Sequence, residues 1–134
     1  MQLVIVRHAE AAPGKPDELR SLTPAGRKQA RALGPQLRDE GIEPDAVVSS
    51  PLRRARETAA ALAAGVGLGE PAIDERLAPG ASPNVFREVA QGRGETVVVV
   101  AHQPDCGLAV AAFTGGPMPP FPPGGHVRLV LDDE

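Results

Sequence analysis

The chain has 134 residues, which is enough for one domain with a hydrophobic core of its own and short for two. Its formal net charge of −3 argues against a nucleic-acid partner, because binding to nucleic acid depends on positive charge that neutralises phosphates. The single cysteine excludes an internal disulfide bond, and no apolar run approaches the roughly 20 residues of a membrane-spanning helix. We therefore expect one domain over residues 1–134, located in the cytoplasm and without a membrane partner.

The first predicted element is a strand over Leu3–Val6, a run of four apolar residues. Such a run is typical of a strand that is buried on both faces of a parallel sheet. It ends directly at Arg7 and His8, two polar residues at a position where α/β proteins often carry their chemistry. A polar segment with prolines and a glycine follows and predicts a loop over 9–21.

A helix is predicted next. Thr23 fits its N-cap, Pro24 its first position and Gly41 its end. Gly34 and Pro35 lie inside this helix, and a proline there removes a backbone donor and crowds the preceding turn. We therefore expect a bend or a break at this point.

The second unit repeats the pattern of strand and helix. Residues 46–49 predict a strand, and Ser50 and Pro51 predict the cap and the first position of a helix that runs to about Ala64 and ends at Gly65. The hydroxyl of Ser50 is expected to act as this cap and not as a nucleophile, because the sequence places no base beside it.

The second half of the chain alternates in the same way. The sequence predicts a short strand near 72–73, a short helix over 83–91, a strand over 96–101 that leads directly into another helix, and a last strand over 126–131. The alternating pattern of the last strand favours an edge position, and the proline-rich stretch 117–123 before it predicts an extended connector.

Strands that alternate with helices predict an α/β fold: a single three-layer α/β/α domain with a mostly parallel central sheet, helices on both faces and an edge strand at the C-terminus. Ligands of such folds bind beyond the carboxyl ends of the strands. Three strand ends should therefore meet there, which carry Arg7 with His8, Ser49 with Ser50, and His102.

These strand ends bring together two imidazoles, at least two guanidinium groups and a helix N-terminus, with no acidic residue directly next to these side chains in the sequence. Guanidinium groups match phosphate oxygens in a bidentate way, and helix N-termini favour anions. Nearby cations also disfavour the imidazolium form, so His8 should stay neutral and nucleophilic. The residues thus indicate a site for a phosphoryl group, with His8 as the attacking residue.

Four segments resemble the motifs of the histidine phosphatase superfamily, which includes phosphoglycerate mutases and acid phosphatases. They occur in the order of that family: "RHAE" (7–10), "LTPAGRKQA" (22–30), "SSPLRRARETA" (49–59) and "VVVVAHQPDCG" (97–107). The short length, the segment "ERLAPGASP" and the proline-rich stretch before the last strand look most like the small SixA-type phosphohistidine phosphatases.

This resemblance implies that His8 becomes phosphorylated and that Arg7, Arg54 and His102 complete the phosphate pocket. Arg54, and not Arg53, directly precedes the alanine of the family motif. The two arginines would differ by about 100° in direction on a helix, so they cannot face one pocket equally well.

Two further residues are candidates with open alternatives. Glu75 resembles the glutamate that phosphoglycerate mutases use as acid and base, and its alternative is a loop carboxylate paired with Arg76 or Arg87. Arg20 is predicted as a phosphate-binding residue, and its alternative is a solvated arginine.

The remaining polar residues suggest little chemistry. Gln103 is placed to touch substrate or to lie on the surface, and His126 is expected to be structural. Cys106 lacks the anion-binding loop of cysteine phosphatases and is expected to be a buried helical residue. We expect neither a metal nor a cofactor, because no convincing ligand spacing is present and the family needs none.

The leading function is hydrolysis of a phosphoryl group through a covalent intermediate on His8, with a phosphohistidine protein as the partner. The alternatives are a phosphatase for a small phosphoester, such as a sugar or nucleotide phosphate, and a noncatalytic phosphate-binding regulatory module. The oligomeric state is not predicted.

Overall fold

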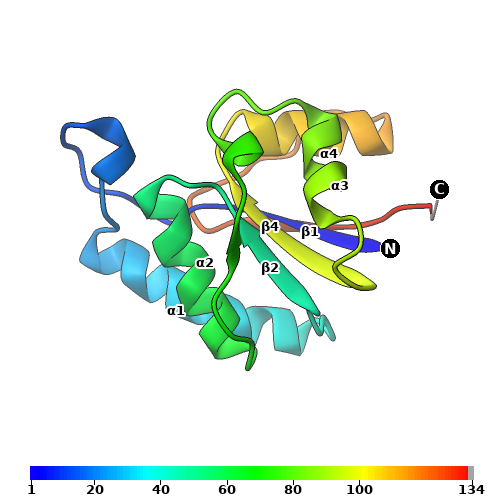
Figure 1. The fold of residues 1–134 in the computed structure, drawn as a ribbon, viewed down its shortest axis with the longest axis horizontal. Helices are drawn as coiled ribbons and strands as arrows, with labels where there is room; N and C mark the ends of the chain where they lie inside the picture. The colour runs from blue at the N-terminus through cyan, green and yellow to red at the C-terminus, as the bar shows by residue number, and fades with distance from the viewer. Residues whose placement is uncertain (133–134) are drawn as a thin grey trace.

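A five-stranded sheet forms the centre of the computed structural model, which describes residues 1–132 (Figure 1). The strand order is β3-β2-β4-β1-β5, and the strands are β1 (Gln2–Arg7), β2 (Ala46–Ser49), β3 (Ala72–Ile73), β4 (Thr96–Ala101) and β5 (His126–Val130). The first four strands in this order are parallel, whereas β5 pairs with β1 in the antiparallel direction. The predicted edge strand at the C-terminus is thus confirmed, and the structure adds its antiparallel direction. Residues 133 and 134, which belong to the predicted domain, lie outside the described residues.

Helices cover both faces of this sheet (Figure 1). One face carries α1 (Pro24–Asp39) and α2 (Arg53–Gly65), and the other carries α3 (Pro83–Ala90) and α4 (Asp105–Thr114). Two short 3-10 helices, η1 (Asp17–Leu19) and η2 (Glu75–Leu77), lie in loops. The arrangement confirms the predicted three-layer α/β/α fold. No helix within residues 1–132 is long and apolar enough to cross a membrane.

The two central strands owe their place to β-branched residues that are buried on both faces. The valines, leucine and isoleucine of β1 and β4 are fully buried, and they divide between two hydrophobic clusters, one under each helix layer. The register pairs Arg7 with Ala101, so His8 and His102 follow at the same level of the sheet. The backbone N–H of His8 donates to the carbonyl of Ala101 at 3.1 Å.

Of the bend or break expected in the first helix, the break is not observed, because α1 runs without interruption through Pro35. Its N-terminus agrees with the prediction: Pro24 is the first residue, and the N–H of Gly26 donates to the Thr23 hydroxyl at 2.9 Å. Leu33 and Leu37 are fully buried against the sheet and α2, and Pro35 faces solvent. Tertiary packing on the buried face therefore outweighs the missing backbone hydrogen bond at Pro35.

The start of α2 also differs from the prediction. The helix begins at Arg53 with Leu52 as its N-cap, and Ser50 is not the capping residue. The N–H of Leu52 donates to the Ser50 hydroxyl at 3.2 Å, so the serine stabilises the turn that leads into the helix. The helix starts later than predicted because the Ser50 hydroxyl also contacts His102, which follows β4.

Candidate active site

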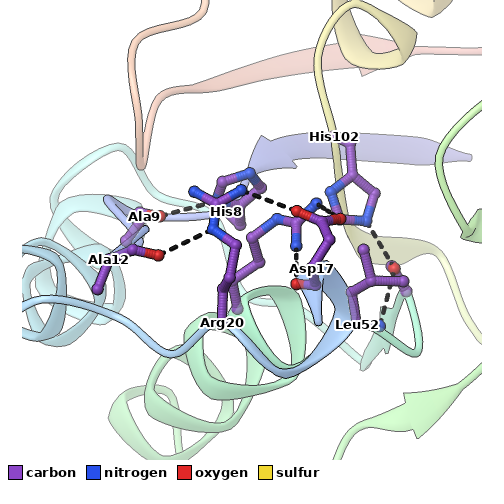
Figure 2. A network of polar contacts seen from close by, with 9 residues as sticks. His8, Ala9, Ala12, Asp17, Arg20, Leu52 and His102 are labelled. Atoms are coloured by element: carbon purple, nitrogen blue, oxygen red, sulfur yellow. Dashed lines mark hydrogen bonds and ion pairs between the residues drawn. The ribbon is translucent and has the colours of Figure 1, made fainter. Parts of the chain in front are cut away.

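The carboxyl ends of β1, β2 and β4 meet at one edge of the sheet and carry His8, Ser50 and His102. The ring centroids of His8 and His102 are 5.3 Å apart, and the two rings are tilted by 55°. Figure 2 shows both imidazoles in one network of polar contacts with the loop that follows β1 and the start of α2. The predicted meeting of the strand ends is therefore observed.

His8 is held with one ring nitrogen free. Its Nδ1 lies 2.7 Å from the carbonyl oxygen of Ala9, and a carbonyl can only accept, so Nδ1 carries the proton. Nε2 then keeps its lone pair. The N–H of Ala9 in turn donates to the Thr58 hydroxyl of α2 at 3.0 Å, which fixes the backbone beside the ring.

The pKa of His8 is lowered from 6.5 to about 4, so the ring is neutral at physiological pH. Burial lowers this pKa most, and the charges of Arg54, Arg7 and Arg20 lower it further, while the hydrogen bond to Ala9 opposes them. The sequence argument named the cations alone, whereas desolvation is the larger cause.

His102 is almost completely buried, with 3% of its surface exposed. Its Nε2 lies 2.7 Å from the Ser50 hydroxyl, and its Nδ1 has no hydrogen-bond partner among residues 1–132. Burial, followed by the charges of His8 and Arg54, lowers the pKa of His102 to about 3. When Nδ1 carries the proton, the Ser50 hydroxyl donates to Nε2 and Nδ1–H is available to an anion.

Arg7 is fixed from behind by the proline-rich segment before β5. One terminal nitrogen of its guanidinium group donates to the carbonyl of Phe121 at 2.9 Å, and its Nε is buried without a hydrogen-bond partner in the described part of the chain. The N–H of Gly124 donates to the backbone carbonyls of Arg7 and His8 at 3.2 and 3.1 Å. We refer to residues 121–125 as the rear loop, since it holds the backbone on both sides of the His8 peptide.

Arg54 and Arg53 have different surroundings, as the helix geometry predicts. Arg54 is 7% exposed, and its two terminal nitrogens donate to the backbone carbonyl of Asp17 at 3.0 Å and to its carboxylate at 3.2 Å. Arg53 is exposed and pairs with Glu57 one turn further along α2, at 3.2 Å. Arg54 therefore lies in the site and Arg53 lies outside it.

Arg20 joins the same network from the loop. Its Nε donates to the carbonyl of Ala12 at 2.8 Å, and a terminal nitrogen donates to the Asp17 carboxylate at 3.0 Å (Figure 2). Asp17 thus links Arg20 to Arg54. Sequence reasoning missed this carboxylate, because it lies in the polar loop between the motifs; its position three residues before Arg20 was the available signal.

Glu75 is not brought into this network. Its side chain is exposed in η2, at the carboxyl end of β3, and forms no hydrogen bond or ion pair with the described residues 1–132, while its backbone carbonyl accepts from the N–H of Ala78 at 3.2 Å. The pairings considered from the sequence are not observed either: Arg76 pairs with Asp74 at 2.9 Å, and Arg87 donates to the backbone carbonyl of Asp132.

The other polar candidates have structural contacts. The side-chain oxygen of Gln103 accepts from the N–H of Gly107 at 2.8 Å, and His126 contacts the Glu40 carboxylate at 2.7 Å. Cys106 is buried in α4, and burial raises the pKa of its thiol to about 12, which makes it a poor nucleophile. The part of the chain from residue 1 to 132 contains no group of three or more side chains that could hold a metal ion.

A comparison with known families agrees with the motifs. The model of the histidine phosphatase superfamily (branch 1) matches residues 3–79, more than half of the chain. The chain belongs to the histidine phosphatase superfamily. This membership confirms the predicted enzyme class, a hydrolase that acts on phosphoryl groups.

Three similar proteins show which members of the superfamily this histidine phosphatase resembles. An uncharacterized protein of Picosynechococcus sp. is 34% identical over 124 residues, which cover 87% of this chain and 74% of that protein. The structure of the protein histidine phosphatase SixA complexed with tungstate is 27% identical, with a TM-score of 0.89 over 99% of this chain and 90% of that one. A putative phosphohistidine phosphatase SixA from Agrobacterium tumefaciens shares the fold, at 24% identity and a TM-score of 0.83, over 96% of this chain and 90% of that one. The resemblance to SixA-type proteins is therefore confirmed.

Proposed function

We propose that this histidine phosphatase removes phosphoryl groups from phosphohistidine on other proteins, through a covalent intermediate on His8. One observation carries the proposal. Within residues 1–132, the buried side-chain nitrogens and oxygens that lack a partner are Arg7 Nε and His102 Nδ1, and both belong to residues beside His8. Buried polar atoms are nearly always paired in native proteins, so two unpartnered nitrogens beside a neutral imidazole indicate a site that binds an anion.

In the first step, Nε2 of His8 attacks phosphorus. The bond from phosphorus to Nε2 forms while the bond to the leaving nitrogen breaks, and the leaving imidazole keeps that electron pair. His8 then carries a positive charge, and its Nδ1–H still donates to the carbonyl of Ala9. Arg7, Arg54 and His102 stabilise the charge on the phosphoryl oxygens, with Arg20 as a further phosphate-binding residue.

In the second step, water attacks phosphorus and the electron pair of the P–N bond returns to Nε2. Phosphate leaves, one proton of the water passes to phosphate or to solvent, and His8 is again neutral. Its low pKa favours this return, because burial disfavours a charged ring. Glu75 stays a predicted proton donor, and a nitrogen leaving group needs such an acid less than an alkoxide does.

A protein substrate is supported by the likeness to SixA, a protein histidine phosphatase, over 99% of this chain. The tungstate in that structure is a tetrahedral oxyanion, as a phosphoryl site requires. A location in the cytoplasm, expected from the single cysteine, also stays a prediction.

The proposal is tested with a protein or peptide that carries ³²P-labelled phosphohistidine. The reaction is quenched in alkaline denaturant, because the P–N bond is labile in acid, and labelled enzyme and free phosphate are measured. We expect transient label on the wild-type chain and on the control His126→Ala, which changes a histidine that contacts Glu40. The variant His8→Ala should show neither label nor turnover.

Other outcomes identify the alternatives. Release of phosphate from small phosphoesters but not from phosphohistidine would replace the proposed substrate class. Binding of inorganic phosphate with no label and no release from either substrate would instead favour a noncatalytic regulatory module.

A further inference from the structure

The carboxylate of Asp17 contacts two arginines of the candidate anion-binding site. Its two side-chain oxygens accept from Arg20 at 3.0 Å and from Arg54 at 3.2 Å, and its backbone carbonyl accepts from Arg54 at 3.0 Å. Phosphoryl groups are anionic, so the negative charge of Asp17 weakens their binding. A carboxylate at this point therefore calls for a role in the reaction that offsets this cost.

The carboxylate lies on the solvent side of the site. The side chain of Asp17 is 59% exposed, whereas that of Arg54, with which it forms an ion pair, is 8% exposed. His102 is buried as well. A substrate therefore has its phosphoryl oxygens toward the buried donors and its leaving group toward solvent, where Asp17 lies.

Asp17 is also held in its ionised form. The hydrogen bond from Arg20 lowers the pKa of this carboxyl most among the favourable contacts, and the charge of Arg54 lowers it further. A carboxylate in this state accepts hydrogen bonds and does not supply protons at neutral pH.

We propose that Asp17 determines the leaving group of this enzyme. Its carboxylate accepts a hydrogen bond from the free N–H of the departing imidazole and so selects phosphoryl groups that are bound to nitrogen. This inference rests on the proposed function. Phosphohistidine with a proton on its distal ring nitrogen is a cation at the ring, and a hydrogen bond from that N–H to a carboxylate favours this form.

The step balances without an external acid. When Nε2 of His8 attacks, the P–N bond of the substrate breaks and its electron pair stays on the leaving nitrogen. The proton on the distal nitrogen stays in place, so a neutral imidazole departs. An ester behaves differently: its oxygen leaves as an alkoxide that needs a proton, and an ionised Asp17 would repel it.

The competing explanation is that Asp17 only braces Arg20 and Arg54. The two roles predict different effects on the binding of a ligand that has no leaving group, such as inorganic phosphate. If Asp17 is a brace, its loss weakens the binding of inorganic phosphate. If Asp17 acts on the leaving group, its loss removes a negative charge from the site, and phosphate binds equally well or more tightly.

The test compares wild type with Asp17→Asn on a phosphohistidine peptide, with inorganic phosphate as inhibitor. We expect kcat/KM to fall by about tenfold, the effect of a lost hydrogen bond to a charged group, while the inhibition constant for phosphate stays the same or falls. Asp17→Glu should recover part of the activity. Glu18→Gln, which removes the neighbouring exposed carboxylate of η1, is the matched control and should behave as wild type.

An unchanged kcat/KM in Asp17→Asn, or a parallel loss of turnover and phosphate binding, overturns the inference while the proposed function stands. A wild-type enzyme that releases no phosphate from the peptide overturns the proposed function and the inference with it. Asp17 is exposed, so its replacement should leave the fold intact, which a thermal unfolding curve would verify.

Discussion

Two consecutive arginines show how position on a helix decides function at the scale of single residues. Arg54 is buried against Asp17 near both imidazoles, and Arg53 points to solvent and pairs with Glu57. Because guanidinium donors fixed at a phosphoryl site stabilise the transition state, we expect Arg54→Ala to lower kcat/KM by about 100-fold or more. Steady-state kinetics on a phosphohistidine peptide measures this loss.

Arg53→Ala is the matched control, since it removes the same side chain one position earlier. Its exposed ion pair is worth about 0.2–1 kcal/mol in stability, and kcat/KM should stay within a few-fold of wild type. Equal losses in both variants would contradict the assignment of Arg54. Arg54→Lys should also be impaired, because a lysine keeps the charge but not the planar fork.

The sequence was sufficient to bring together those candidate site residues that occupy fixed points of regular elements. His8 and His102 follow buried strands, and Arg54 lies in the first turn of a helix, so strand ends and helix geometry locate them. Asp17 and the contact of Ser50 with His102 could not be predicted in this way. Both depend on the path of an irregular segment, which no hydrophobic period describes.

At the scale of elements, α1 and α2 approach each other through two glycines. A Cβ atom added to Gly34 would lie 2.9 Å from the Cα of Gly65, too close for a side chain. Alanine normally stabilises a helix interior relative to glycine, yet we expect Gly34→Ala to lower the free energy of unfolding by about 1–3 kcal/mol. Urea titration measures the change.

Pro35, the next residue in the chain, should respond in the opposite direction. It is exposed within an uninterrupted helix, so Pro35→Ala restores a backbone donor without a clash. We expect a gain of about 1–2 kcal/mol, since the greater freedom of the unfolded alanine chain offsets part of the benefit. A gain in both variants would show that the two helices are not in close contact.

These two helices also show where local sequence signals are insufficient. The valine-rich strands and the Thr23 cap were predictable, because burial and local hydrogen bonding both favour them. The break at Pro35 was wrong, and the start of α2 was shifted by two residues from Pro51. In both places contacts with distant parts of the chain outweigh the local preference of the residues.

At the scale of the whole molecule, the half-buried imidazole of His8 and the buried imidazole of His102 link folding to pH. The pKa values of His8 and His102 fall from 6.5 in the unfolded chain to about 4 and about 3 in the folded one. Between these values the unfolded chain binds more protons, so the free energy of unfolding should fall as the pH drops from about 6.5 toward 4. Urea midpoints across this range test the prediction.

The double variant His8→Asn/His102→Asn provides the comparison, because neither replacement takes up a proton. Its urea midpoint should depend less on pH over the same range, whatever its stability at neutral pH. The ionised Asp17 and Asp74, whose pKa values are also lowered, contribute in the same direction at more acidic pH. An equally steep dependence in the double variant would assign the effect to other groups.

The rear loop contacts the backbone of His8 and can therefore influence the position of its imidazole. The N–H of Gly124 donates to the carbonyls of Arg7 and His8, and the carbonyl of Phe121 accepts from the guanidinium group of Arg7. A change in the length or stiffness of the segment 117–123 would therefore tilt the imidazole through its own peptide. Substitutions in this segment could thus change the orientation of the His8 imidazole without replacing a residue of the proposed phosphate pocket.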